Sequence, residues 1–402
     1  MRFALLGDHP DGVAMACALM ESGRHRVLAY TAALSEDVLR RWGDGARRVS
    51  DMEEVLADPA IEAVIVAGSV AVRPAQLRRA LQSERHVLCV HPADDTPEIA
   101  YEAAMIRNDT GYVLLPLLPE ATHPAFHRLA EFVSWRAGLR KRPETALGAL
   151  TQPCSPLGVF RLLEMERGVA DEVLEGIWIA GQKPSFPGWD ILRTVGGEIQ
   201  EVSAFAEREE LREGEPVLVS GRFEQGGLFQ VTLLPKQKKP SWRLTVIGVD
   251  GRADLMFPLG WDGPACLDWR DVNGETHEEY WERWDPWPVL IETFERLIEA
   301  TSAPADRPRL SWQDALRALE LDDAARRSVE RRRSSVLEYP EATEEVGFKG
   351  TMTLVGCAML WTVLLLLILS VWWPRIGWMI VPLIVVFLGL QFLRYFLPKA
   401  KE

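Results

Sequence analysis

The sequence predicts an N-terminal parallel α/β domain, a second domain with a large and mostly antiparallel sheet, and a C-terminal pair of apolar helices. Three observations lead to this fold class. Short apolar strands alternate with helical patterns up to about residue 123, as in a parallel sheet with crossover helices. Longer strands then follow one another, with turns such as Val249–Arg252 between them. The stretch 351–397 contains almost no charge.

The first domain is expected to span residues 1–123. Its strands are predicted at 3–7, 25–31, 61–67, 86–90 and 112–115, and its helices at 12–22, 36–42, from 52, 73–83 and 97–107. Asp51 precedes Glu54 by three residues, as in a capping box, and Thr96 precedes Pro97, which suits a first helical position. The alternation predicts a Rossmann-type sheet, in which ligands bind beyond the carboxyl ends of the strands.

The second domain is expected to span residues 124–338. A helix at 124–135 opens it, strands are predicted at 158–165, 201–206, 216–223, 228–234, 242–249 and 252–257, and helices at 288–301 and 311–330 close it. The strand patterns indicate one half-exposed, largely antiparallel sheet. Polar residues around Pro340 predict a linker over 339–350.

The composition excludes several classes of function. The 402-residue chain has a net charge of −13, and the residues from Lys349 onward are basic overall, so the acidic charge lies in the body of the protein. An acidic body argues against nucleic acid as a partner. The five cysteines have no CxxC spacing, and His123 and His127 are four residues apart but lack a third ligand nearby. We therefore expect no metal site.

Two apolar runs predict a transmembrane hairpin over 351–397. No charged residue occurs from Gly350 to Pro374 or from Ile376 to Leu393. Both runs reach or nearly reach the length that spans a bilayer. A buried hairpin in a soluble core is the alternative, but two transmembrane helices joined at Trp373–Gly377 fit the composition better. The lipid bilayer is then a partner of this chain.

The basic residues near the two runs predict their orientation. Lys349 precedes the first run, and Arg394, Lys399 and Lys401 follow the second, whereas only Arg375 lies in the turn. Positive residues favour the cytoplasmic side of a membrane. We therefore expect a two-span cell-membrane protein whose globular body and both termini are cytoplasmic.

Four stretches, in this order, resemble the Gfo/Idh/MocA family, the relatives of glucose–fructose oxidoreductase and inositol dehydrogenase. They are 51–64, His86–Pro92, 197–204 and 312–328. The resemblance covers roughly residues 1–338. It implies a Rossmann domain followed by an α/β domain with a large open sheet, with an NAD(P) cofactor and a sugar-like or polyol substrate bound between them. It also implies a homo-oligomer formed through the second domain.

The candidate pyrophosphate loop follows the first strand. Gly7 and Gly12 stand at the first and third glycine positions of the dinucleotide fingerprint, whereas His9 stands at the second. Asp8 and Asp11 would repel a pyrophosphate unless a cation or a protonated His9 offsets their charge. Two interpretations stay open: a variant phosphate loop, or a structural turn that no longer holds a dinucleotide.

The candidate ribose site is the end of the second strand. Thr31 stands where an acidic residue would bind the ribose hydroxyls of NAD. With Arg40 or Arg41 on the next helix, Thr31 would suit a 2′-phosphate, which favours NADP over NAD. The alternative is that these arginines form a solvated helix face.

The catalytic candidates come from the resemblance. His91–Pro92 occupies the place of the family's Lys-Pro dipeptide, which implies that Pro92 lies beside the cofactor. His91 is then either a general acid or base or a residue that only lines the pocket. Asp190 occupies the family's substrate-side aspartate position. The family's histidine three residues earlier is replaced by Pro187, and the sequence offers no nearby histidine instead.

These departures leave two hypotheses. The first is a membrane-anchored NAD(P)-dependent oxidoreductase with an altered site. The second is a non-catalytic pseudo-oxidoreductase that serves as a membrane-tethered ligand-binding or scaffolding protein. The aromatic run Tyr280–Trp287 suits either one, since it could line a sugar-binding cleft or form a packed loop.

Overall fold

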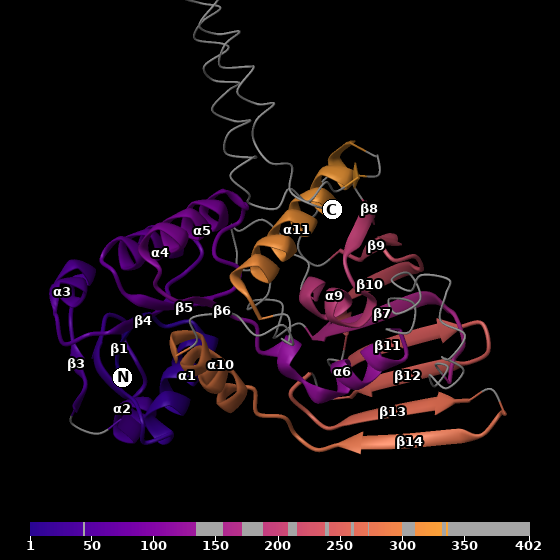
Figure 1. The fold of residues 1–402 in the computed structure, drawn as a ribbon, viewed down its shortest axis with the longest axis horizontal. Helices are drawn as coiled ribbons and strands as arrows, with labels where there is room; N and C mark the ends of the chain where they lie inside the picture. The colour runs from indigo at the N-terminus through magenta and orange to yellow at the C-terminus, as the bar shows by residue number, and fades with distance from the viewer. Residues whose placement is uncertain are drawn as a thin grey trace, which may run out of the picture. The chain divides into compact units, whose positions relative to one another are not determined.

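The computed structural model describes residues 1–42, 45–133, 156–170, 188–207, 215–237, 241–258, 261–271, 273–299, 310–331 and 335–336. Residues Met1–Leu337 form one compact unit. This unit contains two sheets, which are labelled strand by strand in Figure 1.

The first sheet is parallel, as predicted, and has the Rossmann strand order. Its elements are β1 (Arg2–Gly7), α1 (Pro10–Glu21), β2 (Arg26–Tyr30), α2 (Glu36–Trp42), β3 (Arg47–Arg48), α3 (Met52–Ala57), β4 (Ala63–Ala67), α4 (Arg73–Gln82), β5 (His86–Val90), α5 (Glu98–Thr110) and β6 (Leu114–Leu117). In the described residues the strand order is β3-β2-β1-β4-β5-β6. The order reverses between β1 and β4, which is where such sheets open a crevice for ligands.

The second sheet is large and mixed. The remaining elements are η2 (Glu120–Thr122), α6 (Pro124–Glu131), β7 (Phe160–Ala170), α9 (Trp189–Gly196), β8 (Ile199–Ala206), β9 (Val217–Phe223), β10 (Leu228–Gln237), β11 (Ser241–Gly248), β12 (Arg252–Phe257), β13 (Ala265–Arg270), β14 (Thr276–Trp281), α10 (Trp287–Glu299), α11 (Trp312–Arg331) and β15 (Ser335–Val336). In the described part of the chain the order is β14-β13-β12-β11-β7-β10-β9-β8-β15. Only β7 and β10 pair in parallel, so the sheet is mostly antiparallel, as predicted.

The observed elements differ from the predicted ones at a few points. α5 begins at Glu98, and Pro97 occupies the cap position, so Thr96 is not the cap. β6 begins later than predicted and lies at the sheet edge, where Pro116 is tolerated. α6 ends at Glu131, earlier than predicted. The sequence did not predict β13 and β14, because β14 is an edge strand without a fully buried residue and shows no clear apolar alternation.

Helices from late in the chain complete the first domain. α10 joins α1 on one face of the first sheet, where Phe294 packs against Phe3 with ring centroids 5.9 Å apart. α11 joins α4 and α5 on the other face, where buried Trp312 donates from Nε1 to the Ala100 carbonyl oxygen at 2.9 Å. α11 also contacts α9 and β8. One helix therefore packs against elements of both sheets.

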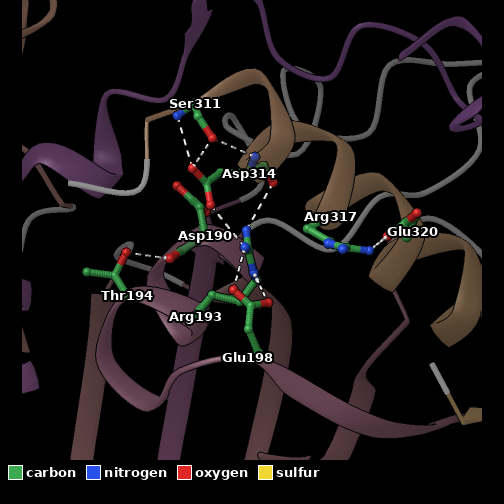
Figure 2. Close-up of polar contacts among 8 residues, drawn as sticks. All are labelled: Asp190, Arg193, Thr194, Glu198, Ser311, Asp314, Arg317 and Glu320. Atoms are coloured by element: carbon green, nitrogen blue, oxygen red, sulfur yellow. Dashed lines mark hydrogen bonds and ion pairs between the residues drawn. The ribbon is translucent and has the colours of Figure 1, made fainter. Parts of the chain in front are cut away.

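A buried arginine holds α9 and α11 together (Figure 2). Arg193 is 2% exposed and donates to both carboxylate oxygens of Glu198, at 3.1 and 2.9 Å. It also donates to Asp314 Oδ1 at 3.0 Å and to the Asp314 carbonyl oxygen at 3.1 Å. The other Asp314 oxygen accepts from the Ser311 backbone N–H and hydroxyl, which caps α11. Burial acts to lower the pKa of Arg193, but the two carboxylates outweigh it and raise that pKa.

The predicted membrane hairpin lies outside the described residues, and so does the predicted linker over 339–350. Within the part of the chain that the structure describes, none of the helices combines the length and the apolar composition needed to cross a bilayer. The hairpin therefore stays a prediction from the sequence.

We expect Arg193→Met to destabilise the protein by about 3 kcal/mol, because it leaves two carboxylates at a buried site without their cation. The replacement keeps most of the volume of the side chain, so the loss measures mainly charge. Urea unfolding followed by tryptophan fluorescence checks this. The control is Arg327→Met in α11, since Arg327 forms an exposed pair with Asp323 and its loss should cost about 0.5 kcal/mol. Equal losses in the two variants would contradict the role given to Arg193.

Candidate functional site

The two glycines of the loop after β1 are required by packing. Gly7 has φ +111°, and a Cβ added there would lie 2.2 Å from the Ala67 carbonyl oxygen. A Cβ at Gly12 would lie 2.3 Å from Ala67 Cβ. Both glycines therefore let the loop and α1 approach β4 closely, which is the geometry that a dinucleotide fold needs.

The middle of the same loop departs from that geometry. His9 caps α1, with its Nδ1 accepting from the Asp11 N–H at 3.3 Å, and the His9 N–H donates to the Ala67 carbonyl oxygen at 3.0 Å. Pro10 has no N–H to offer. Several donors that could bind a pyrophosphate at the start of α1 are therefore already used or absent.

The ring of His9 does not supply a positive charge at neutral pH. Burial lowers the pKa of His9 to about 4, and the nearby Arg73 lowers it further. Burial also raises the pKa of Asp11. Protonation of His9 is therefore unfavourable. A pyrophosphate at this loop would need a different cation to offset the charges of Asp8 and Asp11.

Arg73, at the start of α4, is that cation, and the sequence did not single it out. It is 1% exposed, and its Nε donates to the Gly68 carbonyl oxygen at 3.0 Å while Nη1 donates to the Pro92 carbonyl oxygen. Its charge favours the ionised form of Asp11 and disfavours protonation of His9. Among the described residues no carboxylate forms a hydrogen bond with it, so its positive field acts on the loop.

His91 follows β5 in the same region. Burial lowers the pKa of His91 to about 4, and Arg73 adds to this effect. A general base works best when its pKa lies near the operating pH, so His91 is poorly tuned for that role. Pro92 contributes its carbonyl oxygen to Arg73. The structure thus gives the His91–Pro92 pair a position in the site but no favourable acid–base environment.

A hollow of about 640 Å³ begins beside the ends of β1 and β2 and runs along α1. Its lining includes Asp8, Leu34, Ser35 and Arg41. Arg40, in contrast, pairs with Asp37 on the helix surface. Of the two arginines considered for a 2′-phosphate, Arg41 is therefore the one that faces a hollow.

Thr31 lies at the end of β2. Its Oγ1 accepts from the Gly7 N–H at 3.2 Å, and its own N–H donates to the Leu5 carbonyl oxygen at 3.0 Å. The side chain thus fixes the loop after β1. Any contact of Thr31 with a ribose would have to share a hydroxyl that already holds this loop.

Glu120 is a candidate acid–base group that the sequence did not single out. It lies in η2, directly after β6, and its Oε1 is 3.8 Å from Arg167 Nη2 on β7. Burial raises the pKa of Glu120 to about 7; Arg167 lowers it, and Asp190 and Asp11 raise it further. Its side chain remains 20% exposed. The signal that could have found it is position, an acidic residue just past the carboxyl end of a parallel strand.

Asp190 lies in the first turn of α9 and is 8% exposed. Burial raises the pKa of Asp190, while the N–H groups of Asp190 and Ile191 and the charges of Arg193 and Arg167 lower it. Its influence on the pKa of Glu120 places the two carboxyl groups near each other. Pro187, at the family's histidine position, lies outside the described residues.

The aromatic run is partly packed and partly exposed to a second hollow of about 520 Å³. Trp281 and Trp284 line this hollow, together with His127. Trp284 Nε1 also donates to Thr122 Oγ1 at 3.0 Å. His123 is fully buried and caps α6, with its Nδ1 accepting from the Ala125 N–H.

We expect Glu120→Gln to remove a loss of stability that occurs as pH rises. The folded-state pKa of about 7 lies above the usual 4.5, so between these values the folded protein retains a proton that the unfolded chain has lost. Stability therefore falls as pH rises through this window, by at most about 3 kcal/mol. Glutamine does not titrate, so the variant lacks this fall.

Denaturant unfolding near pH 4 and near pH 8 measures this difference. The matched control is Glu224→Gln in the exposed turn between β9 and β10, which should follow the pH profile of the unchanged protein. If Glu120→Gln follows that profile too, Glu120 ionises at its usual pH and the assignment is wrong.

Three solved structures are similar to this chain. A candidate myo-inositol dehydrogenase from Sinorhizobium meliloti 1021 is 18% identical, with a TM-score of 0.59 over 84% of this chain and 100% of its own. A candidate NADPH-dependent oxidoreductase from Desulfitobacterium hafniense is 17% identical, with a TM-score of 0.65 over 83% and 97%. An oxidoreductase from Agrobacterium radiobacter, solved with NAD+, L-tartaric acid and magnesium, is 17% identical, with a TM-score of 0.63 over 84% and 98%.

No protein-family model and no curated protein matches the sequence. The structural neighbours are oxidoreductases of the Gfo/Idh/MocA type. At these identities the likeness concerns the fold, and it extends over the Rossmann-like domain and the large mixed sheet. The chain therefore has the two-domain fold of Gfo/Idh/MocA-type oxidoreductases.

Proposed function

We propose that this chain is an NAD(P)-dependent oxidoreductase acting on a sugar-like or polyol substrate, with Glu120 in the acid–base role. The observation that carries the proposal is the environment of Glu120. Its carboxyl group titrates near neutral pH at the carboxyl edge of the first sheet, next to Arg167 of the second. That is where cofactor and substrate meet in the fold of this type.

The chemistry divides between cofactor and protein. A bound nicotinamide would accept the hydride from the carbon that carries the reacting hydroxyl. The protein must remove the hydroxyl proton, and ionised Glu120 can accept it because its pKa is close to the working pH. Arg167 stabilises the ionised form of Glu120 before that transfer. Asp190, whose pKa is raised by burial, can hold a substrate hydroxyl.

The residues fit the adenosine half of the cofactor better than the pyrophosphate. The hollow beside α1 has apolar walls, and its polar lining consists of Ser35, Arg41 and the carboxylates Asp8, Glu21 and Asp285. Arg41 is the group there that favours the 2′-phosphate of NADP. One neighbour is named for NADPH and another was solved with NAD+, so the fold accepts both. The N-terminus of α1 supplies few donors, although Arg73 offsets the acidic loop. We therefore expect binding to be weaker than in a standard glycine loop.

One observation favours the second hypothesis, a non-catalytic binding or scaffolding protein. The His9 N–H is bonded to Ala67, the Asp11 N–H is bonded to the ring of His9, and Pro10 has no N–H. If these groups keep their bonds, a pyrophosphate finds too few donors. The aromatic hollow at Trp281 and Trp284 would then be the better place to look for a ligand.

We expect the full-length protein to bind NADPH saturably, and more tightly than NADH because of Arg41. Titration followed by nicotinamide fluorescence measures both affinities. Among polyols and sugars that are turned over, Glu120→Gln should lower kcat by about 10²–10⁴-fold and His91→Gln by less than about tenfold. Glu224→Gln is the matched control. Absence of binding at about 1 mM cofactor would refute the oxidoreductase hypothesis and favour the hypothesis of a non-catalytic binding protein.

We also propose that residues 351–397 anchor the protein in the cell membrane, with the globular body and both termini in the cytoplasm. The support is the two uncharged runs and the basic residues that flank them. A homo-oligomer is a further proposal, supported by apolar side chains exposed on the second sheet. These are Phe205, Leu228, Met256 and Tyr280.

We expect the full-length protein to stay in the membrane pellet after washing with alkaline carbonate. Leu366→Arg and Val385→Arg together place a charge in each run and should release a large share of it, since an arginine at a helix centre costs about 3 kcal/mol in insertion. The control pair, Glu338→Arg and Glu341→Arg, lies before the runs and should leave the protein in the pellet. Release of the unchanged protein by carbonate would contradict the anchor.

A further inference from the structure

Arg167 carries a hydrogen-bonding group that nothing in the proposed chemistry uses. Its side chain is 8% exposed, and its Nη1 is buried without a hydrogen-bond partner among the described residues. A buried donor without a partner costs free energy, and a guanidinium costs more than a neutral group. Such a group commonly marks a place where a ligand completes the hydrogen bonding.

The described contacts of Arg167 involve one face of its guanidinium and its Nη2, and leave Nη1 without a hydrogen bond. Its Cζ lies 3.9 Å from the centre of the Trp242 ring, so tryptophan covers one face of the plane. The distance of 3.8 Å from Nη2 to Glu120 Oε1 is too long for a hydrogen bond. A guanidinium that is stacked in this way presents its N–H groups in one plane, which matches a carboxylate.

We propose that Arg167 binds a carboxylate of the substrate, so that the substrate class is a polyhydroxy acid rather than a neutral sugar or polyol. This inference names the substrate of the proposed site. The acid would lie with its carboxylate on the free edge of Arg167 and a hydroxyl toward Glu120. A phosphate group fits less well, because its second negative charge would face the carboxyl groups that surround Arg167.

The groups that face this position make binding depend on pH. They are Glu120 from η2, Arg167 from β7, Asp190 from α9 and Asp11 from α1. When Glu120 is protonated, one negative charge beside the incoming carboxylate disappears. An acid therefore binds more tightly below pH 7 than above it, and its binding in turn favours protonation of Glu120.

The test compares D-gluconate with D-glucitol, which share a carbon chain and differ in one carboxylate. Calorimetric titration of the full-length protein without cofactor, near pH 6, should give gluconate a Kd about 10–100-fold lower than that of glucitol. Arg167→Gln should reduce this ratio to about threefold or less. The control is Arg243→Gln on β11, where an exposed arginine pairs with Asp254, and it should keep the ratio of the unchanged protein.

A second measurement does not depend on the folding of Arg167→Gln. In the unchanged protein, gluconate affinity should fall about tenfold between pH 6 and pH 8, and in Glu120→Gln it should fall less than about twofold. Equal affinity for acid and polyol, or no acid binding at about 10 mM, overturns the proposal. Gluconate binding without any nicotinamide binding would refute the proposed oxidoreductase and support the carboxylate site at Arg167. Turnover of neutral polyols but not of acids would support the oxidoreductase and refute the carboxylate site.

Discussion

The packing of the two domains depends on the buried charge of Arg193. Glu198 and Asp314 both pair with it, so α9 and the start of α11 are held at one point (Figure 2). From there α11 extends to the first domain, where Arg326 donates to the Asp95 carbonyl oxygen at 2.6 Å. Because Asp190 lies one turn before Arg193, the same ion pairs also hold the turn of α9 that carries the Asp190 carboxyl group. The ion pairs of Arg193 with Glu198 and Asp314 thus help to position the site.

Two further arginines set the electrostatics of the site. Arg73 has only carbonyl oxygens as hydrogen-bond partners, and Arg167 has a stacked tryptophan and a distant carboxylate. Neither is fully neutralised by a hydrogen-bonded anion among the described residues, so each projects positive charge. Their effects differ because of what lies beside them. Burial lowers the pKa of His9 and of His91 and Arg73 lowers both further, whereas Arg167 only partly offsets the effect of burial on Glu120. The pKa values therefore favour Glu120 over His9 and His91 as the acid–base group.

Local constraints are what the sequence could predict. Gly7 and Gly12 follow from spacing, because close approach to Ala67 is a backbone requirement that only glycine meets. The division into a parallel sheet and a mostly antiparallel sheet follows from periodicity. β14 was missed because an edge strand needs no buried face. The prediction that Thr96 caps α5 was wrong, because the helix begins at Glu98 and Pro97 takes the cap position. Glu120, Arg73 and Arg167 could not be ranked from sequence, since their importance depends on burial and on partners more than fifteen residues away.

In the proposed enzyme, the loop after β1 would have to hold a phosphate without the second glycine. At His9 a side chain replaces glycine and few N–H donors are left for a phosphate. At Asp8 and Asp11 the obstacle to a phosphate is negative charge, which a nearby cation can offset. Burial raises the pKa of Asp11 and the charge of Arg73 lowers it, so the positive field of Arg73 acts on this loop. The donors bonded to Ala67 and to His9 remain committed. The loop is thus poor in free hydrogen-bond donors, and in the proposed enzyme cofactor affinity would come mainly from the hollow lined by Ser35 and Arg41.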